Sequence, residues 1–141
     1  PDPPPRRLRL LIAEANPVNR TLIDRMLTRM GHEFVIVEDG AAAVDASAVG
    51  GFDAILMDVH MPVMDGREAS RRIRARESRI RSARLPILAL TADALPGDRE
   101  RCIEAGMDGH LTKPISAAAL REALDDLATQ RPQAGTPGFS A

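Results

Sequence analysis

The sequence has little of several residue types, and each shortage excludes a class of protein. The single cysteine, Cys102, rules out a disulfide framework and a cysteine-rich metal site. No apolar stretch approaches the ~18 residues of a membrane-spanning helix, so we expect a cytoplasmic domain that makes no membrane contact. The net charge of −1 provides no overall attraction to nucleic acid or to anionic lipid.

Both ends of the chain differ in composition from the part between them. Residues 1–7, PDPPPRR, predict an extended linker, and residues 131–141, RPQAGTPGFSA, have the composition of a disordered tail. Neither end is typical of a signal peptide. The first residue is proline rather than methionine, so we expect the chain to be part of a longer protein. The folded domain is predicted over residues 8–130.

Within this domain, short apolar runs alternate with helical patterns. Asn16 and Pro17 predict the start of the first helix, and Gly31 predicts its end. The near-continuous apolarity of the strands indicates a parallel sheet covered on both faces. The fold class is therefore α/β, an open parallel sheet with helices on both sides. The expected strands are 8–13, 34–37, 54–57, 86–90 and 109–112, and the expected helices are 17–30, 40–49, 66–77, 96–105 and 116–129.

Four polar residues follow the expected strands directly. Glu14, Asp58, Thr91 and Lys113 come after the first, third, fourth and fifth strands. We expect them to meet, because the functional crevice of such a sheet lies at the carboxyl ends of its strands. Two carboxylates, a hydroxyl and an ammonium suit phosphoryl chemistry. Mg²⁺ accepts one or two protein carboxylates with water and phosphate, lysine neutralises phosphate oxygens, and an aspartate can act as the nucleophile.

Four stretches in this order and spacing resemble the receiver (response-regulator) domain of two-component signalling: IAEANPVNR, MDVHMPVMDG, LALTA and LTKPI. The resemblance runs from about residue 8 to residue 128. NPVNR and MDGREASRRIR are most similar to receivers carried by hybrid sensor histidine kinases. The resemblance implies a flavodoxin-like fold, a doubly wound five-stranded parallel sheet of strand order 2-1-3-4-5.

The resemblance also implies the roles of individual residues. Asp58 matches the phosphoacceptor, Thr91 the switch hydroxyl, and Lys113 the lysine that contacts the phosphoryl group. His110 takes the place of the switch aromatic residue. The bond between Lys113 and Pro114 matches one that is often cis in the family.

The implied cofactor is Mg²⁺, bound by Glu14, Asp58 and the backbone carbonyl of His60. The implied function is acceptance of a phosphoryl group from a phosphohistidine, which makes a histidine kinase or a histidine phosphotransfer domain the expected partner. The domain is then not an enzyme by itself. The chain has no G-x-x-x-x-G-K-[ST] motif, so any kinase activity would belong to another part of the longer protein.

The sequence departs from the family pattern at Ala15, where the family usually has a second acid that touches the metal. We therefore expect a weakened Mg²⁺ site. The alternative is a degenerate or silenced pseudo-receiver, a non-phosphorylated docking or regulatory module on a histidine kinase. An aspartate-based phosphohydrolase ranks last, because His60 stands where that family would need a second aspartate.

Residues 71–84, RRIRARESRIRSAR, contain seven arginines. A nucleic-acid patch is one interpretation, but the chain has no tyrosine or tryptophan to interleave with the arginines. We favour a solvated helix face that runs into a surface loop, with no direct nucleic-acid contact, and contact with an acidic partner surface ranks between the two. We expect a monomer or a weak dimer.

Overall fold

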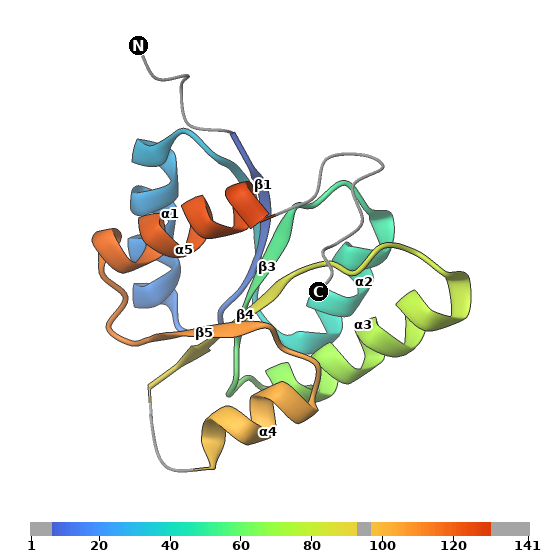
Figure 1. The fold of residues 1–141 in the computed structure, drawn as a ribbon. Helices are drawn as coiled ribbons and strands as arrows, with labels where there is room; N and C mark the ends of the chain where they lie inside the picture. Colours follow the sequence, from blue (N-terminus) through green and yellow to red (C-terminus); the bar gives the residue numbers. More distant parts are fainter. Residues whose placement is uncertain (1–6, 93–96, 131–141) are drawn as a thin grey trace.

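The computed structural model describes residues 7–92 and 97–130, in which five strands alternate with five helices (Figure 1). The expected linker, apart from Arg7, and the expected tail lie outside the described residues. The elements are β1 (Arg9–Ala13), α1 (Pro17–Met30), β2 (Glu33–Val37), α2 (Gly40–Val49), β3 (Ala54–Asp58), α3 (Gly66–Ile80), β4 (Ile87–Thr91), α4 (Asp98–Glu104), β5 (Gly109–Thr112) and α5 (Ala117–Gln130).

The strands form one parallel sheet of order β2-β1-β3-β4-β5, which confirms the predicted topology. β3 lies at the centre, between β1 and β4. In the register of the sheet Asp58 is level with Leu90, and Thr91 is level with Thr112. The carboxyl ends of β1, β3, β4 and β5 therefore face the same edge of the sheet.

Helices cover both faces of the sheet (Figure 1). α1 and α5 pack on one face through buried residues such as Ile23 and Leu120, and α2, α3 and α4 pack on the other through residues such as Ala43, Ile73 and Cys102. Alternate residues of a strand point to opposite faces, so each central strand contributes to both cores. Cys102 is buried in the second core, and this burial raises the pKa of its thiol. No helix among the described residues is long and apolar enough to cross a membrane.

The local signals for α1 act as predicted. The Asn16 side chain accepts a hydrogen bond from the Val18 N–H, Pro17 begins the helix, and Gly31 ends it in the left-handed conformation at φ 83°. The prediction that α3 ends at residue 77 is wrong. α3 continues to Ile80 and ends at Arg81, because no glycine or proline interrupts the chain there.

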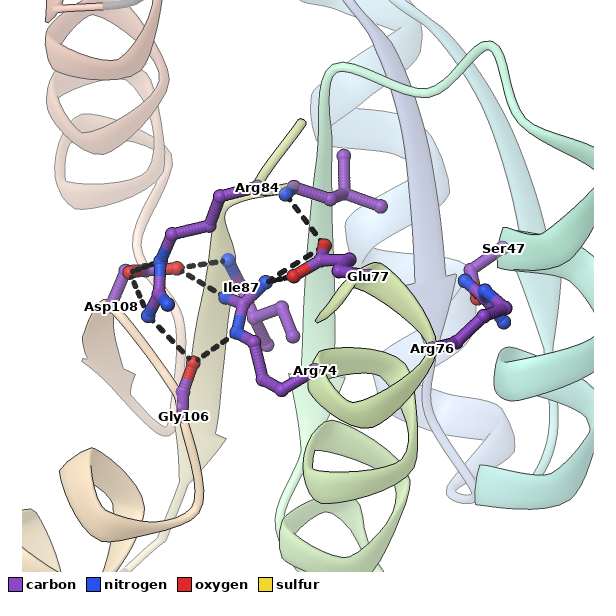
Figure 2. Close-up of polar contacts among 9 residues, drawn as sticks. Ser47, Arg74, Arg76, Glu77, Arg84, Ile87, Gly106 and Asp108 are labelled. Atoms are coloured by element: carbon purple, nitrogen blue, oxygen red, sulfur yellow. Dashed lines mark hydrogen bonds and ion pairs between the residues drawn. The ribbon is translucent and has the colours of Figure 1, made fainter. Parts of the chain in front are cut away.

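The carboxyl-terminal half of α3 is fixed by a polar cluster at the amino-terminal edge of the sheet (Figure 2). Arg74 pairs with Glu77 at 2.7 Å and with Asp108 at 2.7 Å. Arg84 pairs with Asp108 at 2.8 Å, and Asp108 also accepts the N–H of Ile87 at 2.9 Å. We call these five residues the α3 cluster, and it ties α3 to the starts of β4 and β5.

Candidate functional site

Three of the predicted site residues meet at the carboxyl edge of the sheet. The ammonium Nζ of Lys113 lies 2.9 Å from Oε1 of Glu14 and 3.1 Å from Oδ1 of Asp58. Glu14 is completely buried and Asp58 is 4% exposed. A buried carboxylate is strongly unfavourable unless a charged or hydrogen-bonding group lies beside it. The lysine supplies that group for both acids at once.

The backbone around the site holds these side chains in place. Asp58 is the last residue of the central strand, and the His60 N–H donates to its Oδ1 at 3.3 Å. The Asn16 N–H donates to the second carboxylate oxygen of Glu14 at 2.9 Å. Lys113 follows β5, its N–H donates to the carbonyl of Thr91 at 2.8 Å, and its bond to Pro114 is cis, as expected.

The two carboxyls differ in their affinity for protons. Burial raises the pKa of Asp58 to about 6, and the neighbouring Glu14 adds to this rise, against the opposing effect of Lys113. Burial acts on Glu14 in the same direction, but hydrogen bonds with Asp58, Asn16 and Lys113 outweigh it and lower the pKa of Glu14. The two acids together raise the pKa of Lys113 despite its burial. As the pH falls, Asp58 is therefore the first of the two acids to take up a proton.

The site offers oxygen atoms of the kind that a magnesium ion binds. Oε1 of Glu14 is buried and has no partner among the described residues apart from the ion pair with Lys113, so it retains lone pairs for a cation. The described residues contain no group of three or more acidic, histidine or cysteine side chains placed to hold a metal. Two carboxylates with water are nevertheless within what Mg²⁺ accepts. The residues fit the ion, with few protein ligands.

Comparison with known proteins identifies the family. The response regulator receiver domain family matches residues 10–125, which is most of the chain. The chain belongs to this family. The polar residues at its strand ends thus lie in a receiver domain of two-component phosphorelays.

The relatives that match this receiver domain include sensor kinases. The chain is 45% identical over 119 residues to the sensor protein GacS of Pseudomonas syringae, and the match covers 84% of the chain and 13% of GacS. Among solved structures, the receiver domain of the sensor histidine kinase PA1611 of Pseudomonas aeruginosa is 44% identical, with a TM-score of 0.79 and coverage of 88% and 99%. That structure has a magnesium ion coordinated in its active site cleft.

A second solved structure shows a relative with a partner. It is a complex of the Saccharomyces cerevisiae histidine phosphotransfer signaling protein Ypd1 with the receiver domain of Ssk1. The match has a TM-score of 0.86 at 26% identity, and it covers 95% of this chain and 97% of that one. Since the chain spans only 13% of GacS, it corresponds to one domain of that relative.

The remaining predicted residues lie around this site in different ways. Thr91 is the buried last residue of β4, joined to Lys113 through its backbone carbonyl. His110 is exposed on β5 and lines a small cavity of about 70 Å³ between α4 and β5, beside Cys102 and Ile103. His60 is exposed, and its backbone N–H contacts Asp58. The metal-binding role of its carbonyl and the switching role of His110 stay predictions.

Two further residues, Arg20 and Gly66, shape the backbone around the site, and neither was predicted to do so. The guanidinium of Arg20 donates to the carbonyls of Glu14 and Ala15 at 3.1 and 2.9 Å, so it fixes the loop that follows β1. A side chain at Gly66 would collide with the backbone carbonyl of Asp58, so only glycine fits this close approach. Arg20 lies in the NPVNR stretch and Gly66 in MDG. The family resemblance therefore pointed to these stretches, but the contacts of the two residues could not be inferred from the sequence.

The pKa of Asp58 predicts how stability depends on pH. Because its pKa is raised in the folded state, its contribution to the free energy of unfolding is complete below pH 3.8 and is lost as the pH rises to about 6. We expect Asp58→Asn to raise the free energy of unfolding by roughly 2–3 kcal/mol at about pH 7.5 and by little at about pH 4. Urea unfolding followed by circular dichroism, with a chelator present, measures both values.

The control for this prediction is Asp126→Asn, which removes a carboxylate from the exposed face of α5. It should show no comparable gain at neutral pH. Glu14 has the opposite shift, so its contribution is lost only as the pH falls below its ordinary 4.5. A gain from Asp58→Asn of the same size at both pH values would contradict the raised pKa of Asp58.

Proposed function

We propose that this chain accepts a phosphoryl group from a phosphohistidine onto Asp58, and that it is a phosphoacceptor rather than an enzyme by itself. The observation that carries the proposal is the placement of the Lys113 ammonium between the carboxylates of Asp58 and Glu14, at 3.1 and 2.9 Å. A cation so close to an aspartate can neutralise the charge that a phosphoryl group brings to the site. Phosphoryl transfer needs mainly positioning and charge stabilisation, which these three residues supply.

In the proposed step a carboxylate oxygen of Asp58 attacks the phosphorus. The new bond joins this oxygen to phosphorus, the bond from phosphorus to the histidine nitrogen breaks, and its electron pair stays on the imidazole. Asp58 must be ionised to attack, and its pKa of about 6 leaves it ionised at neutral pH. Lys113 then offsets the negative charge of the aspartyl phosphate, while Glu14 holds the lysine in position.

Mg²⁺ is the proposed cofactor, held by Glu14, Asp58 and the His60 carbonyl. When bound, it would neutralise charge on the phosphoryl oxygens as a Lewis acid. The magnesium ion in the active site cleft of the PA1611 receiver domain supports this assignment. The absence of a carboxylate at Ala15 makes the proposed site weaker than one with three acids.

The proposed output is a shift between two packings of the domain. The phosphoryl group would draw the Thr91 hydroxyl toward Asp58, and His110 would repack in the cavity beside α4. Only a group that interacts better with one packing can shift the population. The complex of Ypd1 with the Ssk1 receiver domain supports a histidine phosphotransfer domain as partner, and the relation to GacS supports a hybrid sensor kinase as the parent protein.

Incubation with acetyl phosphate and Mg²⁺, followed by intact mass measurement, tests phosphoryl acceptance. We expect one added phosphoryl group on the wild-type chain, because Asp58 lies beside Lys113 and retains some exposure, whereas Glu14 is completely buried. The adduct should be lost in Asp58→Asn and retained in Asp45→Asn, which removes an exposed carboxylate of α2. The absence of an adduct, with affinity for a histidine kinase fragment retained, would instead support the non-phosphorylated docking module.

Titration calorimetry with Mg²⁺ tests the effect of Ala15. We expect Ala15→Asp to bind Mg²⁺ roughly tenfold more tightly than wild type, which corresponds to a net gain of about 1.4 kcal/mol from a third carboxylate. Ala15→Asn is the matched control, because it adds a side chain of similar size without the charge. Equal affinities of the wild type and Ala15→Asp would show that residue 15 does not limit metal binding.

A further inference from the structure

A second charged region lies on α3 and the loop that follows it. Residues 66–84 contain eight arginines and two glutamates, a net charge of +6 in a chain whose total is −1. The rest of the chain is therefore acidic. An asymmetry of this kind produces a strong local potential that the total charge does not reveal.

Many of these arginines already have fixed partners. Arg74 and Arg84 are held by the acids of the α3 cluster (Figure 2). Arg76 donates to the carbonyl of Val44 at 3.1 Å and to Ser47 Oγ at 2.8 Å. Such contacts fix the directions of these guanidinium groups, so these side chains form a fixed border of the surface.

Two further arginines, Arg79 and Arg81, are exposed. Neither makes an ion pair within residues 7–92 and 97–130. Arg81 holds the left-handed conformation at φ 56° that ends α3. Both are therefore available for an acidic partner.

Arg81 borders a groove with apolar walls. A cavity of about 280 Å³ between the ends of α2 and α3 adjoins a second of about 410 Å³, and the two share Glu77, Ser82 and Arg84. Phe52, Ile80 and Leu85 line the first cavity, and Arg81 lines the second. Ile80 is 58% exposed, and the nearby Val49 is 84% exposed. We call this concave surface the α3 groove.

We propose that the α3 groove is a docking site for an acidic polypeptide segment that carries a large apolar side chain. The apolar side chain would enter the first cavity against Phe52 and Ile80. An acidic side chain beside it would pair with Arg81, whose charge no described acid offsets. Charge complementarity of this kind gives specificity and rapid association, and burial of the exposed Ile80 adds a hydrophobic contribution.

The shape and composition of the groove favour a polypeptide over nucleic acid. Single-stranded nucleic acids stack their bases on aromatic side chains, but Phe52 is the one aromatic residue that lines these cavities. A duplex would present phosphates to the arginines and leave the apolar cavity unfilled. A peptide that alternates acidic and apolar side chains matches both parts of the surface.

Docking at this groove does not use the phosphoacceptor. The groove adjoins the α3 cluster, which contacts the first residue of β4, whereas Asp58 is the last residue of β3. The two surfaces therefore lie at opposite ends of the parallel sheet. A partner segment could occupy the groove while the other end of the domain contacts a phosphohistidine.

The test uses a short fluorescein-labelled peptide of alternating glutamate and leucine, titrated with the chain. We expect saturable binding that weakens as salt rises from about 0.05 M to about 0.3 M. A peptide of alternating glutamate and serine, with the same charge, should bind at least tenfold more weakly. In the ¹⁵N-labelled chain, the peptide should shift the amide signals of residues 47–52 and 76–85 but not those near Asp58.

Two variants and a matched control assign the contacts. Arg81→Glu should weaken peptide binding at least tenfold, and Ile80→Ser should weaken it several-fold. Arg25→Glu, an equal change on the exposed side of α1, should bind like wild type. Circular dichroism confirms that each variant is folded.

Three results would overturn the proposal. The first is no saturable binding of the glutamate–leucine peptide. The second is binding that Arg81→Glu weakens no more than Arg25→Glu does. The third is a labelled DNA duplex that binds more tightly than the peptide and shifts the same amide signals of the groove. That result would make this surface a nucleic-acid site.

Discussion

The ion pairs of Lys113 with Glu14 and Asp58 are the interaction on which the functional edge of this domain depends. Two buried carboxylates at the end of a parallel sheet repel one another, and each loses hydration. One ammonium 2.9 and 3.1 Å from them offsets part of both effects. The same arrangement leaves Asp58 easier to protonate than an ordinary aspartate, and it leaves a basic group where a phosphoryl group would arrive. Stability and the proposed reactivity at this edge thus have one physical origin.

The parallel sheet separates two kinds of surface. Its carboxyl edge concentrates acids and a lysine, whereas its amino-terminal edge is joined to α3 by the α3 cluster and bears an excess of arginine. Five-residue strands connect the two edges through a core that is buried throughout β3 and β4. This buried connection keeps the site and the α3 groove at opposite edges of the sheet, so that the two proposed partners would meet surfaces of different charge.

The sequence was sufficient to predict the fold and the convergence of Glu14, Asp58 and Lys113, because apolar runs locate parallel strands and the ends of such strands share one edge. Other features could not be predicted. The contacts of Arg20 depend on the path of the loop after β1, and the α3 groove joins residues 47–52 to residues 76–85. The extra turn of α3 was missed because a surface helix full of arginines gives a weak apolar pattern. Such features arise from packing between distant segments, which composition and periodicity do not encode.

A carbon-13 NMR titration of the Asp58 carboxyl, in the absence of Mg²⁺, tests the shared-lysine arrangement most directly. In the wild-type chain the Asp58 signal should titrate at about pH 6, and in Glu14→Gln it should titrate at a lower pH, because the neighbouring negative charge is gone. Titration of Asp58 near the ordinary value of 3.8 in both proteins would contradict the account, since it would mean that the two carboxylates do not share one buried site.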